Sequence, residues 1–315
     1  MKKPIVVLTG PTAVGKTELS IQLAKVIGGE IISADSMQGY KYLDVGSAKI
    51  TPEEMDGVRH YLVDELEPFD EFHVVKFQEY AQKYLNEIYA HGKIPIIAGG
   101  TGFYIQALLN DIDFTEQESD SAYRKELEAL AEEHGNQYLH DRLKEVDPES
   151  AEAIHPNNRK RVIRALEFYQ ETGRKISEHN AKEQMRTSPY NFAYFVLNDE
   201  RSHLYKRIDA RVDKMIEDGL EAEVRRLKEM GCTKDMVAMQ GIGYKEMLSY
   251  LDGSYSLEEA VYIIKRETRH FAKRQITWFK RERDVIWLNK NEFDYKNEAI
   301  LAYMIKILKE KAIIS

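Results

Sequence analysis

The sequence predicts an α/β fold, in which a doubly wound parallel sheet is interrupted by an all-helical insertion. Short apolar runs alternate with helical patterns in the first part of the chain, which is typical of a parallel sheet. Strand signals vanish from about residue 113, and an apolar run resumes only at 192–197. We therefore expect a core domain in two parts, 1–112 and 191–315, around an insertion domain at 113–190.

The elements of the first part can be taken in order. The apolar run 5–8 predicts a strand, and residues 17–27 carry apolar side chains at helical spacing directly after it. The runs 30–35 and 93–100 predict two more buried strands, the second preceded by a helical pattern through 77–88. Strands that alternate with helices in this way pair in parallel.

Helices should dominate the rest of the chain. In the insertion we expect them at 123–135, 138–147 and 159–173, because each of these segments is rich in helix formers and closes with Gly or with Asp-Pro. The strand at 192–197 is followed by a helical pattern at 204–227 with a single apolar stripe. From there we expect the core to continue helically to its last residue.

Composition excludes several classes of protein. The 315 residues, 43% of them hydrophobic, can bury a full core, and a net charge of −8 argues against a chain that coats nucleic acid with its whole surface. Cys232 is the only cysteine, which excludes an internal disulfide and a cysteine-based zinc site. An apolar run so close to Met1 leaves no room for a leader, and no stretch reaches membrane-spanning length. We expect a cytoplasmic, bacterial monomer that binds no membrane.

Residues 10–17 match G-x-x-x-x-G-K-[ST], the pattern of a phosphate-binding P-loop, between an expected strand and an expected helix. The glycines let backbone N–H groups curl around phosphate oxygens, and the helix N-terminus adds partial positive charge. Lys16 would neutralise phosphate charge, and the Thr17 hydroxyl would bind Mg²⁺, the one cofactor we expect. The context disfavours a chance glycine-rich turn. The expected phosphate-binding residues are Gly10, Thr12, Ala13, Val14, Gly15, Lys16 and Thr17.

The P-loop alone does not define the reaction. A nucleotide-hydrolysing protein should have an apolar strand ending in an acid that helps to hold Mg²⁺, but the strand at 93–100 ends in glycines before Thr101. Asp64 and Glu65 remain an alternative source of such an acid. Asp35 follows another strand, so it is either a base at the site or the cap of the next turn, and its position alone does not decide.

Basic residues gather in two stretches, Arg159–Arg164 and Lys265–Arg283. The second holds eight Lys or Arg against two Glu, interleaved with aromatic residues, so it is either a solvated helix face or a surface for phosphates and unpaired bases. Both stretches together favour RNA. Arg207 and Arg211 lie one helical turn apart and could reach one anion, or could pair with acidic neighbours such as Asp209 and Asp213.

These motifs resemble those of the tRNA dimethylallyltransferases, also called tRNA isopentenyltransferases, along nearly the whole chain. Eight motifs in the same order are far more specific than one P-loop. They are GPTAVGKT at 10–17, SADSMQ at 33–38, VGSAK at 45–49, GGTGFY at 99–104, HPNNRKRVIRALE at 155–167, RIDARVDKM at 207–215, GIGYKE at 241–246 and AKRQITWFKR at 272–281.

The resemblance implies transfer of a dimethylallyl group from dimethylallyl diphosphate to the exocyclic amine of the adenine 3′ of the tRNA anticodon. The P-loop, with Lys16 as a catalytic residue, would then hold a leaving diphosphate, Asp35 would be the general base, and Thr101 would bind both the diphosphate and tRNA. Arg211 would reach the diphosphate. The residues implied to contact tRNA are Asp35, Ser36, Met37, Gln38, Thr101, Arg124, Lys160, Arg161, Val162, Ile163, Arg164, Gln240, Gly243, Tyr244, Lys245, Lys273, Arg274, Gln275, Trp278 and Lys280.

Other functions stay open at this point. A small-molecule or nucleotide kinase would use the same P-loop with ATP, but would have no use for the basic, aromatic stretch near the C-terminus. A prenyltransferase that acts on free adenine nucleotides would not need the basic residues of the insertion. An RNA-binding module without catalysis would leave Asp35 and Thr101 without a role.

Overall fold

The computed structural model describes residues 2–112, 122–184 and 186–315. The chain forms two compact units, which we call the core unit (Met1–Leu109 with Pro189–Ser315) and the insertion unit (Asn110–Ser188). The expected first boundary, at residue 113, lies outside the described residues. The second lies before residue 190 rather than after it, because Tyr190 already pairs with Lys3 in the sheet.

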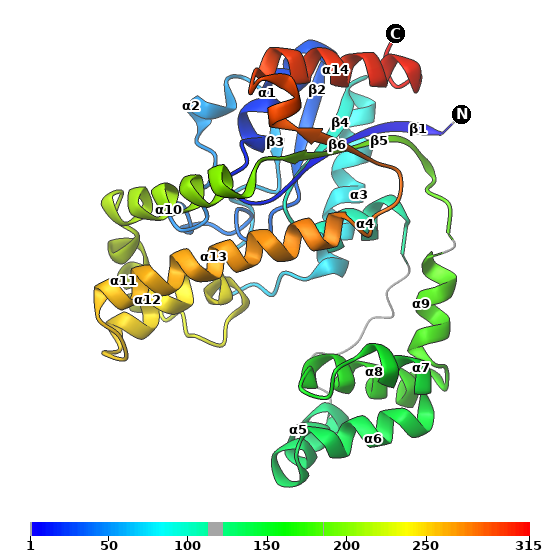
Figure 1. Cartoon of the computed structure of the whole chain (residues 1–315), viewed down its shortest axis with the longest axis vertical. Helices are drawn as coiled ribbons and strands as arrows, with labels where there is room; N and C mark the ends of the chain where they lie inside the picture. The colour runs from blue at the N-terminus through cyan, green and yellow to red at the C-terminus, as the bar shows by residue number, and fades with distance from the viewer. Residues whose placement is uncertain (1, 113–121, 185) are drawn as a thin grey trace. The chain divides into compact units, whose positions relative to one another are not determined.

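The core unit contains one six-stranded sheet in which all strands are parallel (Figure 1). This confirms the predicted fold class, and four of the strands are those expected from the sequence. The order across the sheet is β3-β2-β4-β1-β5-β6. The strands are β1 (Lys3–Thr9), β2 (Gly29–Ser33), β3 (His60–Tyr61), β4 (Ile94–Gly99), β5 (Tyr190–Asn198) and β6 (Val285–Asn289).

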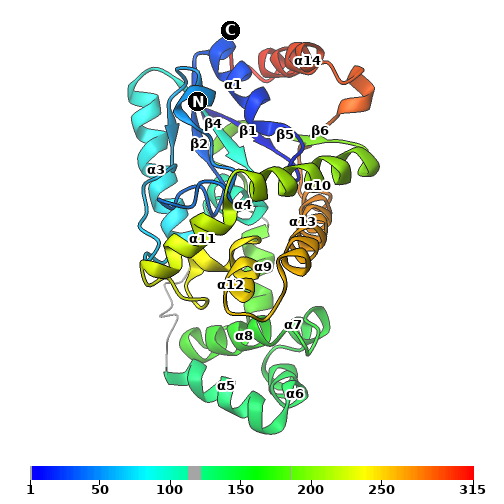
Figure 2. The same cartoon turned by 90° about the vertical axis from the view of Figure 1, so that its left-hand side faces the viewer.

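Helices cover both faces of this sheet, as the nearly continuous apolar strands require. In β1, Ile5 and Val7 face one hydrophobic core, whereas Val6 and Leu8 face the other. The first core packs against α3 (Val74–Ala90) and α4 (Gly102–Leu109), and the second against α1 (Lys16–Ile27) and α14 (Asn297–Glu310), as Figures 1 and 2 show.

The expectation that the core continues helically after residue 227 is wrong, because β6 pairs in parallel with β5. Its residues are only half-buried apart from Leu288, as suits the edge of a sheet. The strand was hidden by the charged residues around it and by its short length. The two-residue β3 at the other edge is too short to show any periodicity.

The remaining helices of the core unit follow β5. The expected helical segment 204–227 is two helices, because Gly219 adopts a left-handed φ of 98° and ends the first. No helix among the described residues has the length and apolar character needed to cross a membrane. The helices are α10 (Arg201–Glu217), α11 (Leu220–Glu229), α12 (Tyr244–Leu251) and α13 (Leu257–Phe279), with a short α2 (Pro52–Met55) before β3 and 3-10 turns at Val237–Gln240 and Lys290–Phe293.

The insertion unit is helical throughout its described residues. The three expected helices are present, and two short ones were missed because they carry few apolar residues. Buried Asp147 accepts hydrogen bonds from Ser150 and Ser177, which joins the starts of the two missed helices. The helices are α5 (Ala122–His134), α6 (Asn136–Val146), α7 (Pro148–Ala153), α8 (Arg159–Thr172) and α9 (Ile176–Gln184).

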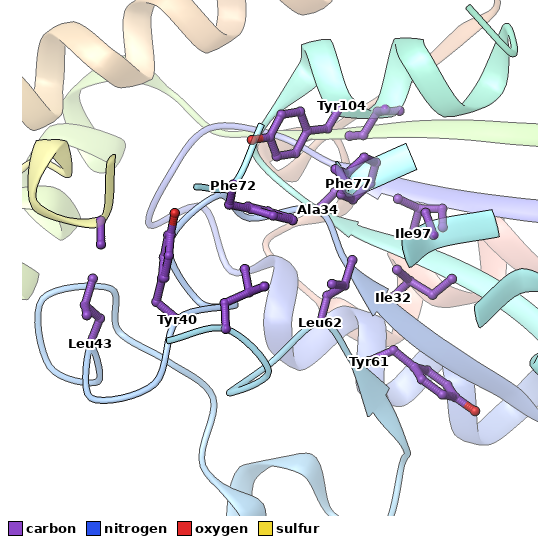
Figure 3. Close-up of a cluster of buried hydrophobic side chains, with 14 of the residues drawn as sticks. Ile32, Ala34, Tyr40, Leu43, Tyr61, Leu62, Phe72, Phe77, Ile97 and Tyr104 are labelled. Carbon is purple, nitrogen blue, oxygen red and sulfur yellow. The ribbon is translucent and has the colours of Figure 1, made fainter. Parts of the chain in front are cut away.

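A row of aromatic rings supports the loops at one edge of the sheet (Figure 3). The ring of Phe72 makes edge-on contacts with Tyr40, 6.3 Å away between centroids, and with Tyr104 at 5.7 Å. Tyr104 also stacks on Phe77 of α3 at 4.6 Å. Such pairs add specific geometry to apolar burial, so the start of α4 is held against the loop that follows β2.

Close approach of two loops requires a glycine at position 99. A Cβ at Gly99 would overlap the backbone of Ala34, directly before Asp35. We predict that Gly99→Ala lowers the free energy of unfolding by about 1–3 kcal/mol, because the backbone has to shift. Gly39→Ala is the control, since its Cβ would overlap no backbone atom and would lie 3.3 Å from the Leu66 side chain and 3.7 Å from the Leu62 carbonyl oxygen. Urea unfolding of both variants checks this, and equal stability of the two would contradict it.

Candidate functional site

A pocket of about 800 Å³ lies in the core unit where three parallel strands end. The P-loop follows β1, Asp35 follows β2 and Thr101 follows β4, and all three segments line the pocket. The carboxyl ends of parallel strands meet at one edge of the sheet, which is where α/β proteins bind ligands. Residues of α10, of α13, of the loop at 46–50 and of the segment 237–245 also line it, so segments far apart in the sequence share one site.

The P-loop has the backbone conformation that the glycine pattern predicted. Gly15, the N-cap of α1, has a φ of 102°. Gly10 has a φ of 148°, and a Cβ there would overlap the carbonyl oxygen of Leu197. Helix α1 therefore begins beside the pocket. The free N–H groups of its first turn add partial positive charge to the pocket. Gly10 and Val14 are the exceptions among the expected ligands, because both are buried and neither lines the pocket, so only their backbone groups could serve.

Lys16 lies at the centre of the positive charge. Its Nζ donates to the carbonyl oxygens of Gly10 at 3.0 Å and Pro11 at 2.8 Å. Burial, followed by the nearby positive charge of Arg211, lowers the pKa of Lys16 to about 8, against the opposing effect of Asp35. An anion bound beside it would restore the preference for the charged form, so the site favours anionic ligands.

Arginines from α10 complete this cationic end of the pocket. Arg211 lines the pocket and donates to the carbonyl oxygen of Ser47, whereas Arg207 Nε donates to that of Ala13 in the P-loop at 2.7 Å. Burial lowers the pKa of Arg211, and Asp35 opposes that shift. The alternative that these arginines pair with Asp209 and Asp213 is wrong.

The two aspartates instead pair with α13, which runs beside α10 (Figure 1). Arg269 bonds Asp209, and Lys265 lies 2.6 Å from Asp213. Neither aspartate therefore neutralises Arg207, which bonds the P-loop, or Arg211, which lines the pocket.

Asp35 caps the turn that follows β2, and it also lines the pocket, so its role as a base stays a prediction. Its Oδ1 accepts hydrogen bonds from the backbone N–H groups of Met37 at 2.8 Å and Gln38 at 3.3 Å, so it caps the turn. Its Oδ2 has no hydrogen bond within the described residues, and the side chain lines the pocket. The cap fixes the carboxylate, which leaves the second oxygen to face a ligand.

Thr101 faces the same pocket from the start of α4. Its backbone N–H donates to Ala34 at 3.2 Å, and its carbonyl oxygen accepts from Tyr104 and Ile105. The bond to Ala34 joins the loop after β4 to the loop that carries Asp35. These bonds hold the Thr101 hydroxyl and the Asp35 carboxylate at one end of the pocket.

Neither Asp64 nor Glu65 lines the pocket, so the alternative magnesium-holding acid is not supported. Asp64 pairs with Lys49. Glu65 accepts a hydrogen bond from the backbone N–H of Leu62 at 2.6 Å and another from the Tyr84 hydroxyl. Both acids stabilise the turn in which they lie.

Glu223 is a residue that the sequence analysis missed. Its buried carboxylate accepts hydrogen bonds from three successive backbone N–H groups, those of residues 44, 45 and 46, at 2.7–3.0 Å. It also accepts one from the Tyr244 hydroxyl at 2.8 Å. Glu223 therefore fixes the loop that brings Ser47 and Ala48 to the pocket. Only the tertiary fold brings α11 to this loop, so no local pattern could have revealed it.

The expected tRNA contacts of the core unit fall into two groups. Ser36, Met37, Gln38, Gln240, Lys245, Arg274 and Gln275 line the pocket, whereas Lys273 is exposed on α13 and Lys280 is exposed at its C-cap. Tyr244 is fully buried against Glu223, and Gly243 is buried beside it, so neither residue presents a surface to a ligand. Gln275 is buried and Trp278 half-buried, both directed into the core unit.

The insertion unit divides its expected tRNA contacts in the same way. Lys160 and Arg161 are exposed and Arg164 is half-buried on α8. The side chains of Val162 and Ile163 lie in the hydrophobic core of this unit, so the expectation of contact through them is wrong. Arg124 makes a two-pronged hydrogen bond to the buried carboxylate of Glu167, which fixes α5 against α8.

Comparison with known proteins supports a single family. A family model described as IPP transferase matches residues 38–282. The chain is 63% identical to a tRNA dimethylallyltransferase of Lachnoclostridium phytofermentans, over 99% of each chain. It is 52% identical to one from Acetivibrio thermocellus, over 94% of this chain and 95% of that one.

Solved structures agree. A full-length tRNA isopentenylpyrophosphate transferase from Bacillus halodurans matches with a TM-score of 0.74 and 45% identity, over 99% of this chain and 98% of that one. A eukaryotic dimethylallyltransferase, in a structure titled as acting on tRNA, matches with a TM-score of 0.78 and 32% identity, over 91% of this chain and 74% of that one. With a match of this extent in sequence and in fold, the chain belongs to the IPP transferase family.

Proposed function

We propose that this chain transfers a dimethylallyl group from dimethylallyl diphosphate to the exocyclic N6 amine of the adenine 3′ of the anticodon in tRNA, and releases diphosphate. The observation that carries the proposal is the pocket itself, where Lys16 and Arg211 stand at one end with Asp35 and Thr101 beside them. The names of relatives with full-length similarity support the same activity.

The cationic end of the pocket suits the leaving group. As the bond between the allylic carbon and the diphosphate oxygen breaks, negative charge grows on diphosphate. Lys16 and Arg211 line the pocket, and together with the N–H groups at the start of α1 they would stabilise that charge more in the transition state than in the ground state. The Thr101 hydroxyl can donate to a diphosphate oxygen from the other side.

The residues present also fit a magnesium ion. Mg²⁺ prefers hard oxygen ligands, and it is often bound through substrate phosphates and water rather than by protein groups alone. The Thr17 hydroxyl lines the pocket and makes no hydrogen bond within the described residues. No group of three or more His, Cys, Asp or Glu in the described residues could hold a metal by itself. Thr17 and the diphosphate would therefore hold the ion, which would add positive charge against the leaving group.

Asp35 is suited to the acceptor. An adenine amine is a weak nucleophile because its lone pair is delocalised into the ring, but its nitrogen becomes acidic as the new carbon–nitrogen bond forms. The free Oδ2 of Asp35 can take that proton as a general base. The adenine has to leave its stack to reach the pocket, so we expect base flipping.

Binding of tRNA would use exposed cations of both units. On α13 these are Lys273, Arg274 and Lys280, and on α8 they are Lys160, Arg161 and the half-buried Arg164. Lysine and arginine side chains neutralise phosphates, which releases counterions and makes affinity fall as salt rises.

The direct test incubates the protein with Mg²⁺, dimethylallyl diphosphate and unmodified tRNA that carries adenine 3′ of the anticodon, followed by mass spectrometry of the digested nucleosides. A gain of one dimethylallyl group on that adenosine supports the proposal. No gain, together with phosphate transfer from ATP to a small acceptor, would replace it with a kinase, and a gain on free AMP but not on tRNA would identify a nucleotide prenyltransferase.

Asp35→Asn should lower kcat by about 10²–10⁴-fold, because the amide still caps the turn but cannot accept the proton. The affinity for tRNA should stay within about twofold of wild type, because the fold of the loop is kept. Single-turnover transfer and filter binding measure the two quantities. Asp64→Asn is the matched control and should transfer at the wild-type rate, since Asp64 lies outside the pocket. Full turnover by Asp35→Asn would exclude the proposed base.

The depressed pKa of Lys16 predicts an alkaline limb in the pH profile. A lysine is charged below its pKa, so kcat/KM for dimethylallyl diphosphate should fall as pH rises through about 8. At saturating substrate the bound anion favours the ammonium form, so the fall in kcat should occur at higher pH. In Lys16→Arg the guanidinium stays charged, and the limb should disappear whatever the absolute rate. A wild-type kcat/KM that stays level well above pH 8 would contradict this role.

A further inference from the structure

Gln275 lies between the two loops that the proposed reaction needs. It belongs to α13 and lines the pocket, but it is only 6% exposed. Its Oε1 accepts a hydrogen bond from the backbone N–H of Thr12 in the P-loop, at 2.9 Å. Its Nε2 donates to the carbonyl oxygen of Gly100, the residue before Thr101, also at 2.9 Å. One amide thus joins the P-loop to the loop that carries Thr101.

The chemistry of these contacts is specific to an amide. Thr12 offers an N–H group and Gly100 offers a carbonyl, so the bridging side chain has to accept at one end and donate at the other. A carboxylate can accept but not donate, and a hydrocarbon of equal length can do neither. A buried N–H or carbonyl without a partner costs more than the bond contributed, so the bridge holds both loops strongly.

The neighbouring glycines show how closely α13 is fitted to this loop. A Cβ at Gly100 would overlap Gln275 Nε2, and a Cβ at Gly102 would overlap the indole of Trp278. The side chains of Gln275 and Trp278 therefore pack directly against Gly100 and Gly102, the residues before and after Thr101. The carbonyl oxygen of Gly10 also lies 3.7 Å from the position that a Gly100 Cβ would take, so the two loops are themselves close.

We propose that Gln275 is a positioning residue, which sets the separation between the P-loop and the Thr101 loop, and that it makes no contact with tRNA. This inference rests on the proposed function, since the separation matters only if diphosphate held by one loop reacts beside the other. The exposed face of the same helix, with Lys273 and Lys280, is left for tRNA. The tRNA-contact motif of the sequence thus combines an outer face for RNA with an inner face that shapes the catalytic pocket.

Gln275→Met keeps the side-chain length and removes both hydrogen bonds. We expect the affinity for inorganic diphosphate with Mg²⁺, measured calorimetrically without tRNA, to fall by about tenfold, as for the loss of a buried hydrogen bond. The kcat for transfer should fall by at least about as much, because Thr101 and the P-loop lose their fixed distance. The affinity for tRNA should stay within about twofold of wild type, because the exposed face of the helix is unchanged.

Lys273→Met is the matched comparison on the outer face of α13, and it should show the opposite pattern, with weaker tRNA binding and unchanged diphosphate affinity. A Gln275→Met protein with weakened tRNA binding and wild-type diphosphate affinity would overturn the inference, and so would one that matches wild type in every measurement.

Gly100→Ala tests the same contact in a second way. The added methyl would displace the side-chain amide of Gln275, while residue 275 itself remains a glutamine. It should weaken diphosphate binding and kcat while leaving tRNA affinity intact. In the double variant with Gln275→Met the losses should not add, because the methyl then has no bridge to break. Additive losses would overturn the inference, and the Gly100→Ala result alone decides if Gln275→Met does not fold.

Diphosphate binding and prenyl transfer by the wild-type protein separate the two proposals. Absence of transfer by wild type would end the proposed function, whereas the diphosphate measurements would still test the bridge.

Discussion

The convergence of three strand ends at one edge of a parallel sheet is the constraint on which the site depends. Parallel pairing of β1, β2 and β4 places the P-loop, Asp35 and Thr101 within one pocket, although nearly a hundred residues of chain separate the first from the last. The loops must then come closer than side chains usually permit, and Gly10, Gly99 and Gly100 make that possible. The sheet and these glycines together form the pocket, in which Lys16, Asp35 and Arg211 lie close to one another.

The charged groups within that space shift one another's pKa values. Burial lowers the pKa of both Lys16 and Arg211. The positive charge of Arg211 lowers the pKa of Lys16 further, and that of Arg207 lowers the pKa of Arg211. Asp35, the only acidic side chain among the described residues that line the pocket, opposes both shifts and so partly offsets the effect of burial. Asp35 is also the proposed base. One carboxylate therefore interacts both with the cations that would bind diphosphate and with the amine that would accept the prenyl group.

The sequence predicted those parts of the fold and site that are encoded locally. A P-loop is a continuous string with its own strand and helix, and Asp35 and Thr101 follow apolar strands, so local patterns were sufficient to place all three at one end of the sheet. The roles of Asp35 and Thr101 came only from the resemblance to a family. Glu223 and Gln275 could not be predicted in their roles, because each acts on backbone groups more than a hundred residues away. Val162, Ile163 and Tyr244 lie within motifs of the family but face inward, which shows that a motif mixes residues that touch a ligand with residues that hold its neighbours in place.

The ion pairs between α10 and α13 change how much of the basic stretch is available to a polyanion. Of the eight cations in Lys265–Arg283, Lys265 and Arg269 are bound to aspartates of α10, and Arg266 lies beside Glu267. The other five cations lie in the last two turns of α13 and in the residues directly after it, so positive charge is concentrated at this end of the stretch. Arg274 of this group lines the pocket, so an RNA strand attracted to these cations would be drawn close to the pocket.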